Sequence, residues 1–225
     1  RRSSDLKAEI NTVYKSSKIF FAQWKAGNSE DGNYIVYFDY EGGQDSDGNT
    51  YKIEKTDGES EITFHTVTTP PKSGWTFNMW IEYCSDGDNE ITSDNCYFQS
   101  HLVGSKYKIH TSPEKFTKST LVQAVWLDEN GNIIWPEKKV VFVDDGEVYG
   151  TRLLNEDGTV KDIPTLSKDN YKFMGWDFED GSRLYSNTVV EAGTFFYSEW
   201  TENEGGNDSP TDWDIYAAIF FDANG

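Results

Sequence analysis

The stretch YKFMGWDFEDG at positions 171–181 concentrates aromatic rings and carboxylates, the side chains that a carbohydrate site uses. Aromatic rings stack on sugar rings, and carboxylates accept hydrogen bonds from hydroxyl groups. In such a site Tyr171, Trp176 and Phe178 would stack on a sugar, and Asp177 or Asp180 would bind its hydroxyl groups. The competing interpretation is structural, with the aromatic residues on the core face of a strand and EDG as the turn that ends it.

A second group of side-chain oxygens lies in GQDSDGNTYKIE, positions 43–54. Four residues fall where an EF-hand-like loop places its calcium ligands: Asp45, Asp47, Asn49 and Glu54. Glycine occupies the first ligand position, however, and no helical pattern flanks the loop, which favours an ordinary hairpin turn. Calcium stays an alternative for this segment and for the acidic loop at 85–94, and no other cofactor is expected.

Catalytic chemistry finds little support in the pattern of residues. The histidines His65, His101 and His110 show no paired metal-ligand spacing, and the chain has neither a GxSxG motif nor a phosphate-binding glycine loop. With 39 Asp and Glu residues, some carboxylate pair will reach a glycosidase-like separation by chance. The sequence therefore predicts a protein that is not an enzyme.

The acidic residues lie mostly in short groups beside Gly or Asn, which indicates tight turns. Seven such groups occur: EDGN (30–33), DSDGN (45–49), TDGE (56–59), SDGDN (85–89), DENGN (128–132), NEDGT (155–159) and EDGS (179–182). Asp-Gly and Asn-Gly adopt the positive backbone angles that hairpin turns require. Together with 8 Trp, 13 Tyr and 14 Phe, these turns predict a mainly β chain with antiparallel or mixed sheets.

The chain also repeats itself. A strand-like run that closes on tryptophan occurs three times, ending at Trp24, Trp126 and Trp200. An apolar run that meets an aspartate and then a glycine also occurs three times: YIVYFDYEGG (34–43), KVVFVDDGEV (139–148) and YAAIFFDANG (216–225). We expect Asp39, Asp144 and Asp222 to be equivalent positions in these runs. Between them, WTFNMW (75–80) matches YKFMGW (171–176), which favours the structural interpretation of the opening stretch.

These elements divide the chain into two complete and two partial repeats. The expected parts are the tail of a preceding repeat (1–24), a complete repeat (33–126), a second complete repeat (138–200), a linker (201–213) and the head of a following repeat (214–225). The two complete repeats differ in length, since 46 positions separate Trp80 from Trp126 but only 24 separate Trp176 from Trp200. The first repeat therefore carries an insertion that its sibling folds without, and this makes the insertion a candidate for function.

The insertion contains both cysteines of the chain, Cys84 and Cys96. A disulfide between them is the favoured interpretation for a secreted protein, and two free thiols are the alternative. The candidate ligand-binding residues in and around it are Tyr83, Asp86, Asp88, Glu90, Tyr97, Phe98 and His101. Aromatic side chains act as rigid anchors and carboxylates steer basic partners, whereas the competing interpretation is an extra structural hairpin.

Several of these motifs resemble the Listeria–Bacteroides repeat, also called the internalin B-repeat. The residues that carry the resemblance are FFDANG (220–225), YKFMGW (171–176), FFYSEW (195–200) and FFAQW (20–24). The match is looser in the first repeat, where Met79 replaces the glycine before Trp80. The resemblance implies small β-grasp-like modules strung in tandem on secreted or wall-attached bacterial proteins, with no catalytic residue to carry over.

The formal net charge of −19 disfavours nucleic acid and anionic lipid as partners, and no apolar run is long enough to insert into a membrane. We expect an extracellular segment of a bacterial adhesin, secreted or bound to the cell wall, that binds a host macromolecule. A host protein, such as an immunoglobulin or a matrix protein, fits the charge better than a glycan. The alternatives are a passive stalk and a carbohydrate-binding module.

Overall fold

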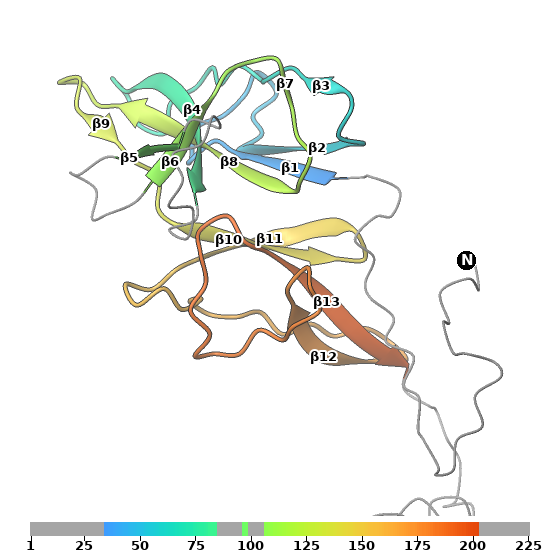
Figure 1. Ribbon diagram of the computed structural model, residues 1–225. Helices are drawn as coiled ribbons and strands as arrows, with labels where there is room; N and C mark the ends of the chain where they lie inside the picture. Colours follow the sequence, from blue (N-terminus) through green and yellow to red (C-terminus); the bar gives the residue numbers. More distant parts are fainter. Residues whose placement is uncertain (1–33, 85–95, 99–105, 203–225) are drawn as a thin grey trace, which may run out of the picture.

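A computed structural model describes residues 34–84, 96–98 and 106–202, and all regular structure in these ranges is β-strand (Figure 1). The predicted mainly β class is confirmed. The strands form two larger sheets, one in the first module (34–134) and one in the second module (139–202). Among the residues in these ranges, no helix is long and apolar enough to cross a membrane.

The sheet of the first module has the strand order β2-β1-β8-β4-β6-β5, with β9 paired to β8. Its strands are β1 (Tyr34–Asp39), β2 (Tyr51–Thr56), β4 (Thr76–Cys84), β5 (Cys96–Phe98), β6 (Lys106–His110), β8 (Thr120–Leu127) and β9 (Ile133–Ile134). A separate short pair consists of β3 (Glu61–Ile62) and β7 (Glu114–Lys115). Strands β1 and β8 are parallel, whereas β1–β2, β4–β8, β4–β6, β5–β6 and β8–β9 are antiparallel.

The sheet of the second module has the order β11-β10-β13-β12. Its strands are β10 (Lys139–Asp144), β11 (Glu147–Leu153), β12 (Tyr171–Asp177) and β13 (Phe195–Glu202). The first two strands form an antiparallel hairpin, the first and last are parallel, and the last two are antiparallel. This arrangement matches the four strands β2, β1, β8 and β4 of the first module. A β-bulge also recurs at equivalent places, between Phe77 and Met79 and between Phe173 and Gly175.

The pairing of the parallel strands corrects one equivalence that the sequence suggested. Phe38 pairs with Val122, four residues before Trp126, and Phe142 pairs with Phe196, four residues before Trp200. Phe38 and Phe142 are therefore equivalent, which makes Asp144 the counterpart of Tyr40 and not of Asp39. Because neighbouring residues of a strand point to opposite faces, Asp39 and Asp144 serve different sides of their sheets.

One face of each sheet, the inner face, covers a core of aromatic residues within its own module. Trp80 packs against Phe38 with ring centroids 5.5 Å apart, and Trp176 packs against Phe142 at 4.7 Å. Trp176 is 1% exposed. The structural interpretation of YKFMGW is thus confirmed, and the EDG turn follows it, where the amide of Gly181 donates to the carbonyl of Phe178 at 2.9 Å.

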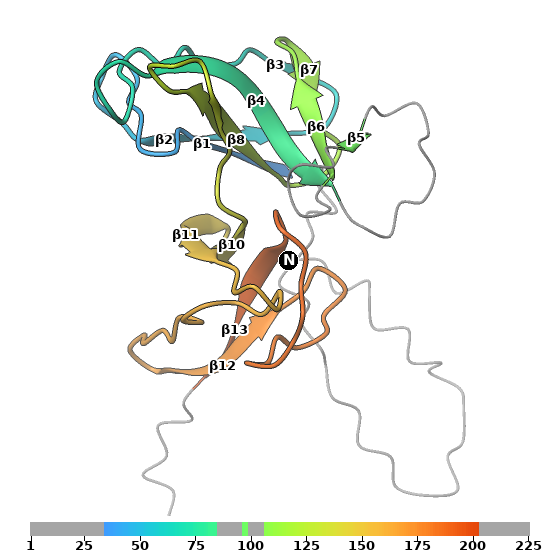
Figure 2. The same cartoon turned by 90° about the vertical axis from the view of Figure 1, so that its left-hand side faces the viewer.

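The opposite faces of the two sheets, the outer faces, pack against each other (Figures 1 and 2). The shared core contains Ile35, Tyr37 and Leu121 from the first module and Val141, Val143 and Phe195 from the second. Equivalent positions meet in this contact, since Tyr37 corresponds to Val141 and Leu121 to Phe195. Strands β1, β8 and β10 are consequently buried on both faces, with nearly every residue inaccessible to solvent.

Part of the inserted region has a structural role in the sheet of the first module. Strand β6 pairs with β4, and β5 pairs with β6, so they extend the sheet of the first module beyond the four strands that both modules share. The connecting segment between the two complete repeats (127–138) also contributes, because β9 within it pairs with β8. Five of the seven acidic turn groups fall wholly within the described ranges, and all five lie at turns or bends.

Candidate functional site

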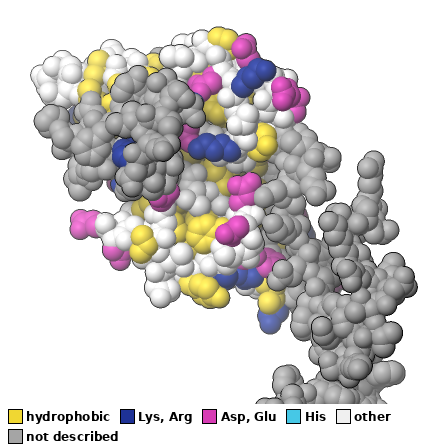
Figure 3. All heavy atoms as spheres, viewed as in Figure 1, with side chains coloured by type: hydrophobic (Ala, Val, Ile, Leu, Met, Phe, Trp, Pro, Cys, Tyr) yellow, Lys and Arg dark blue, Asp and Glu magenta, His cyan; other side chains and the backbone are white. Residues whose placement is uncertain are grey.

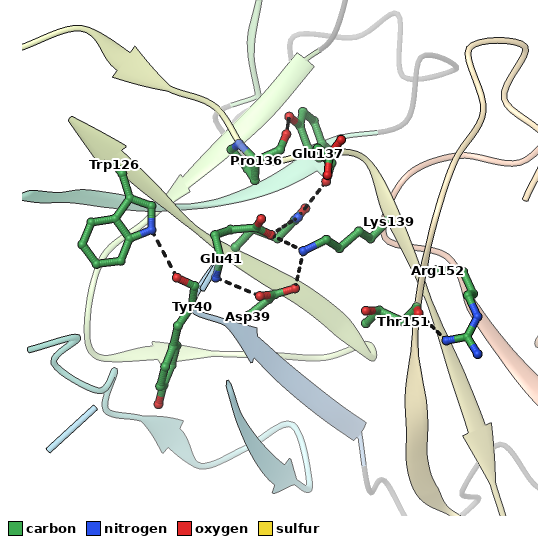
Figure 4. Close-up of polar contacts among 11 residues, drawn as sticks. Asp39, Tyr40, Glu41, Trp126, Pro136, Glu137, Lys139, Thr151 and Arg152 are labelled. Atoms are coloured by element: carbon green, nitrogen blue, oxygen red, sulfur yellow. Dashed lines mark hydrogen bonds and ion pairs between the residues drawn. The ribbon is translucent and has the colours of Figure 1, made fainter. Parts of the chain in front are cut away.

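A partly buried polar cluster joins the two modules at one end of their shared core (Figure 4). The ammonium group of Lys139 lies 2.8 Å from Oδ2 of Asp39 and 2.7 Å from Oε1 of Glu41. Gln123 donates from Nε2 to the same oxygen of Glu41 at 2.8 Å and to the carbonyl of Glu137 at 2.9 Å. The cluster therefore links β1 and β8 of the first module to β10 of the second and to the connecting segment.

The charged groups of this cluster are partly buried, and their protonation depends on one another as well as on burial. Burial alone would lower the pKa of Lys139, but the carboxylates of Asp39 and Glu41 outweigh it and raise that pKa. Burial and the neighbouring Asp39 raise the pKa of Glu41. The amide of Glu41 donates to Oδ1 of Asp39 at 2.8 Å, which provides a further partner for that carboxylate. A cation held by two carboxylates, each of which also accepts a hydrogen bond from an amide, is suited to fixing an interface, because each buried polar group has a partner.

The closing tryptophan of each repeat ties the last of the four shared strands to the end of the first strand. Nε1 of Trp126 donates to the carbonyl of Tyr40 at 3.1 Å (Figure 4). In the second module, Nε1 of Trp200 donates to Oδ1 of Asp144 at 2.7 Å, and Ser198 donates to the same oxygen at 2.5 Å. Position 40 and position 144 are equivalent, so a backbone acceptor in one module is replaced by a side-chain acceptor in the other.

A groove of about 1080 Å³ lies where the modules and the connecting segment meet. Its lining comes from Tyr83 and Cys84 of the first module, from Trp135, Pro136 and Lys138 of the connecting segment, and from 154–158 and 189–192 of the second module. Tyr83, Pro136 and Val190 are buried, whereas the carboxylates of Glu156, Asp157 and Glu191 are exposed. An apolar floor with an acidic rim is the form of a site for a basic, partly apolar segment.

Across the wider surface, the negative charge is dispersed. Asp and Glu side chains are spread over both modules on the face shown in Figure 3, with Lys and Arg side chains among them. Many of the exposed acidic residues also have local structural roles. Asp45 and Asp128, for example, each accept the side-chain amide of an asparagine, Asn49 or Asn132, as well as backbone amides of their own turns. These hydrogen bonds hold the carboxyl pKa below its usual value.

Of the candidate ligand-binding residues, the structure describes one side chain. Tyr83 is 8% exposed, and its hydroxyl donates to the carbonyl of Pro136 at 2.6 Å. Burial raises the pKa of this hydroxyl to about 12. The side chains of the other candidates lie outside the described residues: Asp86, Asp88, Glu90, Tyr97, Phe98 and His101. Tyr83 thus occupies the floor of the groove and braces the connecting segment.

The predicted disulfide stays a prediction. Cys84 ends β4 and is not free, whereas the side chain of Cys96, in β5, lies outside the described residues.

Three of the four calcium candidates lie in one tight turn before β2, and Glu54 lies apart from them within β2. Asp45 accepts the amides of Asp47 and Asn49, each at 2.9 Å, which is the bonding of a tight turn. Glu54 lies in β2 and contacts His65 at 2.9 Å and Lys52 at 3.2 Å. Within the described ranges, no group of three or more His, Cys, Asp or Glu residues could hold a metal ion.

The carboxylates of the opening stretch are engaged within the second module. Asp177 contacts Nε of Arg183 at 2.5 Å, and Glu199 contacts Nη2 of the same residue at 2.6 Å. Burial and the hydrogen bond with Glu199 raise the pKa of Asp177 to about 7, against the effect of Arg183. Asp180 accepts the amide and the hydroxyl of Ser182 in the turn. Phe178 packs on the core that contains Trp176.

A buried histidine cluster is not apparent from the sequence, where only paired histidines signal a site. The side chain of His110 is fully buried, with Nδ1 2.8 Å from Glu114 and Nε2 3.3 Å from Glu82. Burial alone would lower the pKa of His110, but the two carboxylates outweigh it and raise that pKa. Lys118 and Lys108 contact the outer oxygens of Glu82 and Glu114, at 2.6 and 2.5 Å. The cluster joins β4, β6 and β7 and is a scaffold feature of the inserted region.

Neither a scan of protein-family models nor a search of curated proteins returns a match to this chain.

Proposed function

We propose that this chain is a non-catalytic, rigid spacer segment of an extracellular bacterial surface protein, secreted or held at the cell wall. The observation that carries the proposal is the packing of the two outer faces against each other. The shared core between the modules contains three residues from each: Ile35, Tyr37 and Leu121, and Val141, Val143 and Phe195. At one end of this core, Lys139 of the second module forms ion pairs with Asp39 and Glu41 of the first. Two modules fixed in one orientation act as one longer rod, which is what a stalk requires.

The sequence resemblance to the Listeria–Bacteroides repeat agrees with this proposal. The shared strand order, with a hairpin followed by a long crossover to a parallel strand, is compatible with the β-grasp-like module that the resemblance implies. Support for a non-catalytic role comes from the engagement of Asp177, Glu82 and Glu114 in ion pairs that stabilise the modules.

Distance measurements between the modules test the rigid spacer. Spin labels on non-natural amino acids at the exposed positions Ser73 and Ser167 avoid the native cysteines. A single narrow distance distribution is expected in wild-type protein, and a broader one in the variant Lys139→Met. A broad distribution in the wild type would show that the modules move independently and would overturn the proposal.

A second candidate function is adhesion to a host macromolecule, and the groove beside the insertion favours it. The apolar floor and the carboxylates of Glu156, Asp157 and Glu191 suit a basic segment of a host protein better than an acidic glycan. Replacing 85–95 with a short Gly-Ser segment, with Cys84 and Cys96 retained, tests the insertion in a pulldown from serum and mucosal proteins. The double variant Glu156→Gln/Glu191→Gln tests the groove separately. Unchanged capture of the same ligand by both variants would refute adhesion through this region.

A further inference from the structure

Among the four strands that the two modules share, the first and the last lie side by side and run in the same direction in each module. In the first module, β1 pairs with β8 from Val36↔Thr120 to Asp39↔Gln123. In the second, β10 pairs with β13 from Val141↔Phe195 to Val143↔Tyr197. The chain enters each module at the beginning of its first strand and leaves its shared four-strand sheet at the end of its last strand (Figure 1). Tension along the chain therefore pulls the two strands in opposite directions along their own axes.

Loading of this kind places the inter-strand hydrogen bonds in shear, so that they bear the force together. Peeling, by contrast, breaks such bonds one after another. From this topology we propose that each module is a mechanical clamp and that the segment carries tension as well as setting a distance. The inference builds on the proposed spacer function, because it requires that force pass through the chain from end to end.

Additional bonds tie both ends of the clamp in the first module. At the beginning of β1, the amide of Ile35 donates to the hydroxyl oxygen of Ser119 at 3.1 Å. Beyond the end of β1, Trp126 donates from Nε1 to the carbonyl of Tyr40 at 3.1 Å. The first and last strands are thus joined on either side of their ladder, which lengthens the set of bonds that tension must break together.

The second module has the same device built from different groups. At the beginning of β10, the amide of Gly193 donates to the carbonyl of Lys139 at 2.7 Å, and the amide of Val141 donates to the carbonyl of Thr194 at 2.9 Å. At the other end, Trp200 donates to Asp144 at 2.7 Å. Hydrogen bonds therefore join the two parallel strands at both ends in each module. At each end, the acceptor group in the second module differs chemically from the one in the first.

Burial on both faces adds resistance to sliding. Phe38 is 0% exposed on the inner face and Leu121 is 1% exposed on the outer face. A slip by one residue would bring the wrong side chains to each face, so the smallest slip that restores the pattern is two residues. Both cores must be disrupted before the strands can move that far, because their side chains interlock with neighbours at close-packed density.

Single-molecule force spectroscopy on the full chain tests the clamp through the direction of pulling. Handles at the two termini load both modules in shear, and two high-force unfolding events are expected. A second attachment scheme keeps the N-terminal handle but places the other in the exposed turn between Glu156 and Asp157. Force then leaves the second module through β11, whose Leu153 pairs with Lys139, and it peels the hairpin from that end. Loss of one high-force event, with the other retained, is expected; two unchanged events would overturn the proposal.

Two tryptophan variants in the second module separate mechanical strength from equilibrium stability. Trp200→Phe and Trp176→Phe each keep an aromatic ring and remove an indole N–H donor. The first variant loses the bond to Asp144 at 2.7 Å, together with a longer one to Ser198 of the same strand, and the second loses the bond to the carbonyl of Pro164 at 2.6 Å. Of these bonds, only the one between Trp200 and Asp144 joins the first and last strands of the module, β10 and β13. Trp200→Phe should therefore lower the unfolding force of this module, whereas Trp176→Phe should lower its stability in urea and leave the force unchanged.

If the unfolding force of the second module fell in proportion to its stability in urea in both variants, the mechanical clamp would be overturned. Such a result would leave the spacer proposal standing, since that proposal is judged by the distance between labels. Conversely, independent motion of the modules would refute the rigid spacer and leave the shear geometry within each module untouched.

Discussion

The ammonium group of Lys139 lies 2.8 Å from the carboxylate of Asp39, a residue 100 positions earlier in the chain. The contact joins the start of the first strand in the second module to the end of the first strand in the first module. It also fixes how the two outer faces are aligned, because these charges are partly buried and have few other partners of opposite sign. The relative placement of the modules thus depends on a specific ion pair as well as on apolar packing.

Replacing Lys139 with methionine should strongly destabilise the protein. The variant keeps most of the length of the side chain but leaves the carboxylates of Asp39 and Glu41 next to each other without a cation. Removing one partner of a buried ion pair costs about 3–5 kcal/mol in free energy of unfolding. Urea denaturation measures the loss. Lys138→Met is the matched control, since the exposed Lys138 makes a cation–π contact with Tyr83, 5.9 Å from the ring centroid, and no ion pair with a residue that the structure describes. Equal losses in the two variants would contradict the prediction.

Tyr83→Phe should destabilise the protein by about 1–2 kcal/mol, because the carbonyl of Pro136 loses a buried hydrogen-bond donor. The bond that is removed is 2.6 Å long and links β4 to the connecting segment. Thermal or urea unfolding provides the measurement. Tyr185→Phe serves as the comparison, since Tyr185 is 63% exposed and its hydroxyl should contribute little. A neutral Tyr83→Phe variant would show that this residue does not brace the junction.

Stability should depend on pH through the cluster of His110, Glu82 and Glu114. The pKa of His110 is raised above 6.5, so its contribution is complete below that pH and is lost as the pH rises through the raised value. Interactions with His110 and Lys108 overcome burial and lower the pKa of Glu114 to about 2, so its contribution is complete above 4.5 and is lost as the pH falls towards 2. The cluster should therefore stabilise the fold most between pH 4.5 and 6.5.

The variant His110→Gln tests this window. It should lose about 2 kcal/mol of unfolding free energy at pH 6, where hydrogen bonds to charged partners are made, and the loss should shrink as the pH rises. His65→Gln removes a partly exposed contact with Glu54 and should cost less than about 1 kcal/mol. A difference between wild type and His110→Gln that stays constant from pH 6 to pH 9 would contradict the assignment.

Gly175→Ala should cost about 1–3 kcal/mol, because position 175 adopts a φ of 131° that residues with a β-carbon rarely accept. An added Cβ would also collide with Nη1 of Arg183, whose guanidinium would have to leave Asp177 and Glu199. Denaturation in urea gives the loss. Met174→Ala is the neighbouring control, and since Met174 is 45% exposed, its truncation should change stability by less than the glycine substitution.

Local patterns were sufficient for the fold class and for the turns. Asp45 and Asp180 sit in turns because their carboxylates accept amides within a few residues, and such bonding depends on nearby sequence alone. The repeated aromatic spacing likewise placed Trp80 and Trp176 in the cores of their modules. Each of these features depends on residues that are only a few positions apart, so the local sequence is enough to predict it.

Features set by distant partners could not be predicted in the same way. The register of β1 comes from β8, more than 80 positions later, and matching aspartate to aspartate therefore misaligned Asp39 with Asp144. The partners of Lys139 lie in the other module, and the residues near Lys139 in the sequence do not indicate them. One usable signal was present in KVVFV (139–143), since an apolar run without alternation indicates a strand covered on both faces.

The packing of equivalent outer faces against each other limits how many modules can join through this contact. Tyr37 and Leu121 of one module face Val141 and Phe195 of the other, so each module offers the other the same side of its sheet. A contact of this kind is self-complementary and saturates at two members, as an isologous dimer does, while head-to-tail contacts extend indefinitely. A third module of this type finds neither outer face vacant. Any longer array is therefore counted in pairs, with its bending concentrated in the linkers between one pair and the next.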